Sequence, residues 1–210
     1  MYSIKTFEAE MVKIEDKRLI PNFMHIMADV EPDFYIDPAS KTGKYHPPDS
    51  NGEGGLVRHS LRVATIAAKF AECIGVETDL MRIAGYLHDI CKTIDYKEHA
   101  RLAAIKIKEE IAYLVDDLYL SPEVKGLTDK WNNIAKMVES HMGKWGYKQP
   151  HTIPETAFHL ADIAASMPEY MSIEFAEQQG KIIRKARYLA GMYGIICLQK
   201  ERANAITVVD

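Results

Sequence analysis

The sequence predicts an all-α fold, and three observations support this class. From Gly55 onward, apolar residues recur every three or four positions in successive segments, which is the spacing of one helix face. Helix-boundary signals separate these segments, among them Ser121-Pro122 and a capping box at residues 152–155. Histidine and aspartate residues recur on the inward faces of the same segments. We therefore expect helices that enclose a polar site.

The composition is typical of a soluble globular protein of one domain. With 210 residues the chain can bury a substantial core, and its hydrophobic content of 47% and charged content of 27% are ordinary for that class. No apolar run approaches membrane-spanning length, and the first residues lack the apolar region of a signal peptide. We therefore expect a cytoplasmic protein with no membrane partner. The net charge of −4 gives no support to broad nucleic-acid binding.

The cysteines limit the kind of metal site that the chain can form. Cys73, Cys91 and Cys197 are odd in number and widely spaced. This pattern argues against a disulfide framework and against a thiolate zinc site. Any metal is therefore expected to have nitrogen and oxygen ligands.

Residues 1–54 are predicted to form a helical element followed by a loop. Apolar residues at helical spacing indicate the helix: Leu19, Phe23, Ile26 and Met27. Pro21 lies near its start, and Glu-Pro-Asp at 31–33 ends it. Residues 37–54 are rich in Pro, Gly, Ser and Asp, which predicts an irregular loop. Within it, Tyr45 and His46 are candidates for a pocket mouth, but we favour an ordinary exposed pair.

The helix that begins at Gly55 carries the first candidate site residues. Its apolar stripe consists of Leu56, Val63, Ala67, Phe70 and Ile74. His59 lies on this stripe, three residues after Leu56 and four before Val63. A lone histidine on an apolar face is usually a hydrogen-bonded core residue. Arg62, three residues further on, makes a functional role worth considering.

The following helix is predicted to start near Thr78, as an N-cap, and to run to the pair His88-Asp89. Its inward stripe consists of Leu80, Ala84, Leu87 and Cys91, and His88 falls on that stripe. A buried carboxylate is costly without a positive partner, so Asp89 requires a metal, a cation or a substrate group. Lys92 lies at i+3 from Asp89 and can supply charge to the same pocket. A capped helix end with an Asp89–Lys92 pair is the simpler alternative.

Two further helices end or begin with histidines. The first follows Asp95-Tyr96, has His99 one turn before its stripe, and buries Ala103, Ile107, Ile111 and Leu114. The second begins at Pro122 and carries the stripe Leu127, Trp131, Ile134 and Val138, which reaches His141 before Gly143 and Gly146 end it. Residues 144–150 mix bases and aromatics, as pocket rims and ordinary exposed loops both do.

The last two helices differ in character. Residues 157–165 are apolar all round, so this helix is expected to be central and buried, with Asp162 as a second core carboxylate. A C-terminal helix is expected over roughly Lys181 to Lys200. Its apolar side consists of Ile182, Ala186, Leu189, Tyr193 and Ile196. Its basic side is interpreted as a solvated face rather than a polyanion site.

Taken together, His59, His88, Asp89 and Asp162 come from three helices, and octahedral coordination of Mn, Fe, Mg, Co or Ni suits these ligands better than structural zinc. The matching stretches are Gly-Gly-Leu-Val-Arg-His-Ser at 54–60, Leu-His-Asp-Ile-Cys-Lys at 87–92 and His-Leu-Ala-Asp at 159–162. Their order resembles the HD superfamily of metal-dependent phosphohydrolases, and most closely its branch of bacterial 3′-5′ exoribonucleases.

The resemblance implies an all-α HD-domain bundle with the metal site at its centre. It implies a core over 55–170, preceded by the element at 1–54 and followed by helices at 171–210 on the same domain. His59, His88, Asp89 and Asp162 would hold one divalent ion. A second ion would be bridged by Asp89 and completed by His99 and His141. However, that branch has two consecutive histidines where this chain has His141-Met142, and a thioether is a poor ligand for a hard metal. His159 would orient a metal ligand without binding the ion itself, or would be a structural residue.

The implied chemistry is hydrolysis of a phosphate ester by metal-activated water. Lys92 would neutralise a phosphate and Arg62 would assist. Without a second ion, His99 or His141 would serve as acid or base. The substrate would be a nucleotide or a nucleic-acid end, with Tyr86, Tyr96, Trp145 and Tyr147 as candidates for base stacking or for packing. The alternatives are a non-catalytic, metal-stabilised HD module that binds a nucleotide or a protein, and a metal-free helical protein. The oligomeric state is left open.

Overall fold

The fold is all-α, as predicted. The computed structural model describes residues 1–43, 46–116 and 122–166, which contain helices and no β-strand. The α-helices are α1 (Ile4–Glu10), α2 (Ile20–Ala28), α3 (Gly55–Ile74), α4 (Thr78–Leu87), α5 (His99–Asp116), α6 (Pro122–Ser140) and α7 (Ile153–Ser166). Short 3₁₀ turns lie between them, including η4 (Pro48–Ser50) and η5 (Gly143–Trp145). The helix predicted over residues 181–200 lies outside the described residues.

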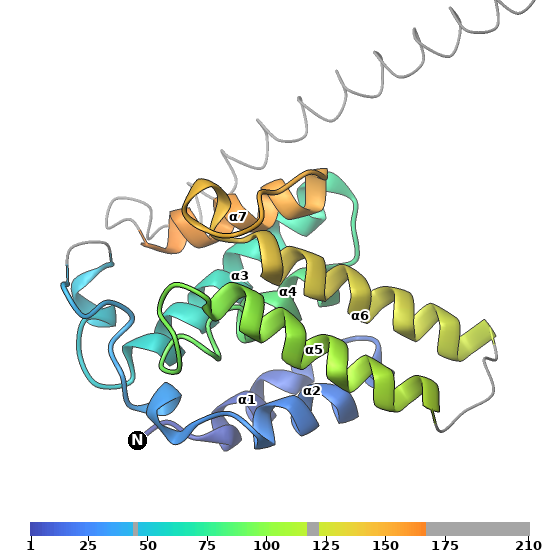
Figure 1. Cartoon of the computed structure of the whole chain (residues 1–210), viewed down its shortest axis with the longest axis horizontal. Helices are drawn as coiled ribbons and strands as arrows, with labels where there is room; N and C mark the ends of the chain where they lie inside the picture. Colours follow the sequence, from blue (N-terminus) through green and yellow to red (C-terminus); the bar gives the residue numbers. More distant parts are fainter. Residues whose placement is uncertain (44–45, 117–121, 167–210) are drawn as a thin grey trace, which may run out of the picture.

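The seven α-helices of the described residues surround one apolar core. Helix α3 packs against α4 and α7, α5 packs against α6, and α6 also contacts α4 and α7. Figure 1 shows α3 and α4 between the N-terminal helices at the bottom of the view and α7 at the top, with α5 and α6 in front. Side chains from all seven α-helices contribute to the same buried cluster. Where the N-terminal and C-terminal units divide stays a prediction.

Helices α3 and α4 form a hairpin, and the apolar stripe predicted for each helix is its buried face. The predicted stripe of α3 is buried throughout, and the helix ends at Gly75, whose φ of 68° is the left-handed conformation that glycine adopts most readily. The next helix starts one residue earlier than predicted, with Glu77 at the N-cap and Thr78 as its first residue. The predicted stripe of α4 is buried too, and it carries His88 and Asp89 into the interior.

Gly85 sets the distance between these two helices. A Cβ atom at this position would lie 2.4 Å from the Cα and 2.5 Å from the backbone nitrogen of Ala64 in α3. Real Cβ atoms do not approach backbone this closely, so only glycine permits the observed packing. Because His59 and His88 lie on these two helices, this close approach also brings the two imidazoles together.

The N-terminal helices are joined to α4 by aromatic packing. Tyr86 is fully buried, with its ring 5.7 Å from Phe7 and 5.8 Å from Phe23, both in edge-to-face arrangements. The phenol donates a hydrogen bond of 2.7 Å to Glu10. Of the two roles left open for Tyr86, base stacking and packing, the structure shows packing, since the side chain is part of the core.

A buried carboxylate at the start of α4 fixes the segment between α1 and α2. Oδ2 of Asp79 accepts hydrogen bonds from the backbone N–H groups of Glu15 at 2.9 Å and Asp16 at 2.7 Å. We expect Asp79→Ala to lower the free energy of unfolding by about 1–3 kcal/mol, because two backbone donors lose a charged acceptor. Urea denaturation measures this. The exposed Glu72, paired with Lys69, supplies a control, Glu72→Ala, expected within about 0.5 kcal/mol of wild type. Equal effects of the two substitutions would contradict the assigned role of Asp79.

The predicted central position of α7 is wrong. This helix buries one face, formed by Ala157, Phe158, Ala161, Ala164 and Ala165, whereas Leu160 and Ile163 are only half-buried. The apolar character all round comes from alanines, which allow close packing on α3 and place Asp162 at the margin of the core. In the described parts of the chain, no helix has the length and apolarity needed to cross a membrane.

Candidate metal centre

The predicted site residues meet at one place in the bundle. His59 lies in the second turn of α3, His88 and Asp89 follow the last residue of α4, and His99 is the first residue of α5. His141 follows the last residue of α6, and Asp162 lies in α7. All are buried except Asp162, whose side chain is 17% exposed. Five helices therefore contribute to the centre, and the expectation that Asp162 is a fully enclosed core carboxylate is corrected to a partly accessible one.

Three of the histidines are oriented by the helix ends on which they lie. Their Nδ1 atoms lie 2.9, 2.8 and 2.7 Å from the backbone carbonyl oxygens three residues earlier, for His88 with Gly85, His99 with Tyr96 and His141 with Val138. A carbonyl oxygen can only accept, so each Nδ1 carries the hydrogen. In the neutral imidazole the lone pair is then on Nε2, which is the atom that faces the centre.

The Nε2 atoms face one another in pairs. His99 Nε2 lies 3.1 Å from His141 Nε2, and His59 Nε2 lies 3.2 Å from His88 Nε2. In the His99–His141 pair, two rings that each carry their hydrogen on Nδ1 turn two Nε2 lone pairs toward each other, which is repulsive unless a cation lies against both. A separation near 3 Å is also that of neighbouring ligands on one ion with metal–nitrogen bonds of about 2.1 Å. The donor set thus fits a divalent ion.

Asp89 lies between the two histidine pairs and directs one oxygen to each. Its Oδ2 is 3.4 Å from His88 Nε2 and 3.8 Å from His59 Nε2. Its Oδ1 is 3.0 Å from His99 Nε2 and 3.7 Å from His141 Nε2. Oδ1 is buried and accepts no hydrogen bond, as expected when neither facing nitrogen carries a hydrogen. An orphaned carboxylate oxygen beside two unprotonated imidazoles is what a cation would satisfy.

The ligand atoms form overlapping groups that could each hold an ion. Within the described residues these are His59, His88 and Asp89; His88, His141 and Asp162; and Asp89, His99 and His141, each with its ligand atoms within 4.8 Å of one another. Asp162 Oδ1 also lies 3.0 Å from His59 Nε2 and 3.7 Å from His88 Nε2, which places it with the first group. Asp89 belongs to both the first and the third group.

The electrostatics of the centre favour an ionised Asp89 and a neutral His141. Burial opposes the charge of Asp89, but the positive charges of His88 and Lys92 outweigh it and hold the pKa of Asp89 well below its usual value. Burial, reinforced by the charges of His88 and His99, lowers the pKa of His141 to about 3. An ionised carboxylate and an unprotonated imidazole are the forms that bind metal.

Lys92 and Arg62, the two predicted phosphate-neutralising residues, are placed differently. Lys92 Nζ donates a hydrogen bond of 2.7 Å to Asp89 Oδ2 and is 11% exposed, so it lies at the edge of the centre. Arg62 instead binds the loop before α3, where it contacts Asp49 and donates a 3.0 Å hydrogen bond to Ser50. A direct part for Arg62 in the reaction stays a prediction.

His46 takes the less favoured of the two positions that the sequence left open, next to the candidate site. The preference for an ordinary exposed residue is wrong, because its ring is half-buried against His59, with ring centroids 4.7 Å apart. Burial first, and then the neighbouring charge of His59, lowers the pKa of His46 to about 3. It belongs to an irregular loop, where no periodicity signals an inward side chain. Tyr45 lies outside the described residues.

His159 contacts the backbone of His141 and so supports the His99–His141 pair. Its Nδ1 hydrogen-bonds to the backbone carbonyl of His141. Its ring also lies against Gly143, where a Cβ atom would come within 2.6 Å of it and where φ is 54°. Of the two roles expected for His159, this contact favours positioning of a ligand.

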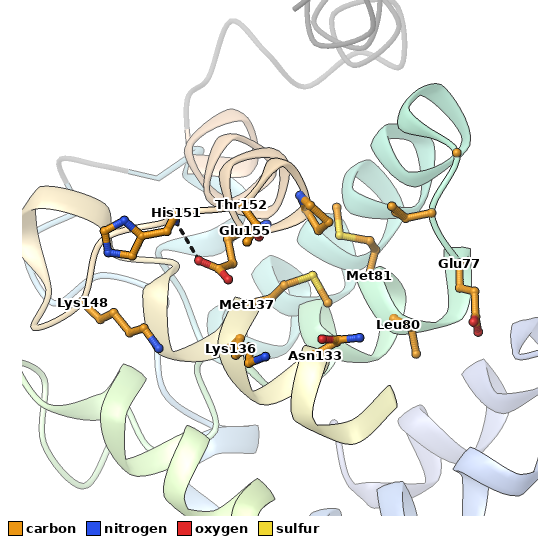
Figure 2. A pocket seen from close by; sticks show the side chains of 13 residues that line it. Glu77, Leu80, Met81, Asn133, Lys136, Met137, Lys148, His151, Thr152 and Glu155 are labelled. Atoms are coloured by element: carbon orange, nitrogen blue, oxygen red, sulfur yellow. Dashed lines mark hydrogen bonds between the residues drawn. The ribbon is translucent and has the colours of Figure 1, made fainter. Parts of the chain in front are cut away.

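A well-defined hollow in the described part of the chain does not coincide with this centre. It has a volume of about 770 Å³ and lies between the start of α4, the middle of α6 and the segment before α7. Figure 2 shows Met81, Met137 and Lys148 among its lining side chains, together with the hydrogen bond from His151 to Glu155. None of the residues of the histidine and aspartate cluster lines it. The convergence of ligand atoms, rather than a hollow, therefore locates the site.

Comparison with known families agrees with this geometry. The HD domain family model matches residues 56–167, which is more than half of the chain. The chain belongs to the HD domain family, whose members are usually metal-dependent phosphohydrolases.

One curated relative has a similar sequence. Ribonuclease Y of Desulforamulus reducens is 22% identical to this chain over 138 residues, which are 66% of this chain and 23% of that protein. The chain thus spans about a quarter of the length of this relative. No solved structure gives a significant match. Membership of the 3′-5′ exoribonuclease branch stays a prediction.

Proposed function

We propose that this protein is a metal-dependent phosphohydrolase that cleaves a phosphate ester of a nucleotide or a nucleic acid with two divalent ions. The observation that carries the proposal is the pair His99–His141, whose Nε2 lone pairs face each other 3.1 Å apart beside the orphaned oxygen of Asp89. A structural core histidine pair would have one ring donating to the other, and here both donors are already used by backbone carbonyls.

The residues of the chain divide between two ion positions. The first would be held by His59, His88, Asp89 and Asp162, and the second by Asp89, His99 and His141. Bound divalent ions supply Lewis acidity toward a phosphoryl oxygen and lower the pKa of water toward neutrality. Both positions offer nitrogen and oxygen ligands, which suit Mn, Fe, Mg, Co or Ni. The second position does not depend on Met142, because two imidazoles and one carboxylate are already present.

Lys92 would hold the phosphate. An ammonium group has three N–H donors, and Asp89 Oδ2 accepts one of them. The remaining donors are available to a phosphoryl oxygen at the accessible edge of the centre. The pKa of Lys92 is raised because the charge of Asp89 outweighs the effect of burial, so the group stays cationic at neutral pH. Its charge would oppose the negative charge that builds on the phosphate during hydrolysis.

Metal analysis together with a substrate panel tests this function. The chain would be stripped with a chelator, reloaded with Mn²⁺ and analysed for bound metal. It would then be assayed on nucleoside mono- and triphosphates, cyclic nucleotides, bis(p-nitrophenyl) phosphate and short RNA and DNA. We expect two equivalents of Mn²⁺ and turnover of at least one phosphodiester. A folded protein with two bound ions and no turnover would overturn the proposal and favour the non-catalytic binding module.

Substitution of His159 tests how the second ion position is supported. We expect His159→Phe to weaken the binding of one Mn²⁺ by about 10–100-fold and to leave the other largely unchanged, because residues that orient a ligand typically have effects of this size. Titration followed by electron paramagnetic resonance resolves the two affinities. His151, whose ring lies at the separate hollow, gives the matched control His151→Phe, with both affinities as in wild type. Equal weakening of both ions by His159→Phe would indicate general loosening of the fold.

A further inference from the structure

The exposed aromatic side chains of this protein are concentrated at one place. Among the side chains that the structure describes, the exposed aromatic residues are Tyr96, Trp145 and Tyr147, with exposed fractions of 51%, 65% and 82%. All three lie on the two loops that carry His99 and His141. We call them the aromatic rim. The other described aromatic side chains are buried or half-buried in the core and its margins.

Tyr96, on one side of the aromatic rim, is connected to the metal centre by contacts with His99 and Lys92. The backbone carbonyl of Tyr96 accepts the hydrogen bond from His99 Nδ1, and the two ring centroids are 6.3 Å apart. Lys92 Nζ lies 5.9 Å from the centre of the Tyr96 ring while it binds Asp89. A ligand stacked on Tyr96 would therefore have its phosphate next to Lys92.

The other side of the aromatic rim, which consists of Trp145 and Tyr147, lies shortly after the end of α6 in the chain. Trp145 lies four residues after His141, in η5, and its backbone N–H donates to the carbonyl of Met142 at 3.2 Å. Lys144 Nζ lies 4.7 Å from the centre of the indole ring. Tyr147 lies two residues after Trp145 and is the most exposed of the three rings. Tyr96 and Trp145 thus each have a lysine close by.

We propose that the aromatic rim stacks the bases of a single-stranded nucleic acid whose scissile phosphate lies at the metal centre. This assignment rests on the proposed function and narrows its substrate to an oligonucleotide. Exposed rings next to cations suit bases joined by phosphates, because stacking and charge attraction then act on the same ligand. A free mononucleotide has a single base and would use one ring, whereas here three rings occupy two loops. An apolar protein partner would not call for lysines beside the rings.

Tryptophan fluorescence reports directly on the rim. The chain has two tryptophans, of which Trp131 is fully buried and Trp145 is exposed. On the Mn²⁺-loaded full-length chain, we expect a phosphorothioate-linked octauridylate to quench the emission of Trp145 and UMP to quench it far less at equal concentration. Tyr96→Ala and Tyr147→Ala should each raise the Kd of the oligonucleotide by roughly 5- to 100-fold. Trp145→Ala, measured by anisotropy of a labelled oligonucleotide, should do the same. Val12→Ala, at an exposed apolar residue in η1 (Met11–Lys13), is the control expected to match wild type.

The failure of this inference is distinguishable from failure of the proposed function. Turnover of bis(p-nitrophenyl) phosphate, with no quenching of Trp145 and an unchanged Kd in the rim variants, would overturn the stacking assignment and leave the hydrolase standing. Quenching and weaker binding in the rim variants, with no turnover of any ester, would uphold the stacking assignment and overturn the hydrolase. Absence of both binding and turnover would overturn both.

Discussion

Asp89→Asn is expected to reduce hydrolysis strongly and to weaken the binding of both ions. Within the described residues, Asp89 is the carboxylate that faces both histidine pairs, with one oxygen toward each. Asparagine preserves the size of the side chain, but it offers one oxygen and no charge. We expect turnover of the preferred phosphodiester to fall by roughly 10²–10³-fold or more, which is the range for loss of a preorganised electrostatic group. Metal analysis of the purified variant should find less than one equivalent of Mn²⁺.

The same substitution should change stability through Lys92. The carboxylate accepts the 2.7 Å hydrogen bond of an ammonium that is only 11% exposed, so its removal leaves a largely buried cation without its partner. Breaking a buried pair on one side typically costs about 3–5 kcal/mol. The double variant Asp89→Asn/Lys92→Met removes both charges and should recover most of that stability in urea denaturation without recovering turnover. A stable, metal-loaded and active Asp89→Asn variant would contradict both the bridging role and the proposed mechanism.

Much of the fold and the centre was predictable because the signals are local. Each helix from α3 to α6 shows its buried face as apolar residues at a spacing of three or four. The described side chains of those stripes are buried as expected, except Leu127, which is half-buried; the side chain of Leu114 lies outside the described ones. His59, His88 and His141 continue the same stripes, so their inward position follows from the period alone. Asp89 and Asp162 were identified because acids beside apolar faces need partners, and the structure places histidines or lysine next to both.

The features that sequence reasoning missed depend on contacts between distant segments. The exposed side of α7 is set by how its alanines pack on α3, and an apolar sequence does not reveal which face remains open. His46 lies in a loop whose path is determined by tertiary contacts. The resemblance to the HD superfamily groups His99, His141 and Asp89 in sequence, but the facing of their ligand atoms comes from three separate segments and depends on the tertiary structure.

Gly85→Ala is expected to destabilise the α3–α4 hairpin strongly for a single added methyl group. The new Cβ would meet the Cα and nitrogen of Ala64, which are backbone atoms and cannot move as a side-chain tip does. Helices α3 and α4 would have to separate, and overpacking of this kind costs about 1–3 kcal/mol, occasionally more. The separation also moves His88 away from His59, and a shift of about 1 Å in a catalytic group can cost on the order of 10²-fold in rate. Urea denaturation and turnover of the preferred ester measure the two effects.

A second glycine in the same bundle provides the matched control. Gly126 lies on the exposed face of α6, where a Cβ would find no atom within 4 Å. Gly126→Ala should therefore stabilise the protein by about 0.5–1 kcal/mol, since alanine is the better helix residue. Ala64→Gly should fail to rescue Gly85→Ala, because it removes only the contact of 2.9 Å with the Ala64 methyl group and leaves the two shorter contacts with the backbone of residue 64. A Gly85→Ala variant as stable as Gly126→Ala, or one rescued by Ala64→Gly, would show that this close approach does not set the distance between His59 and His88.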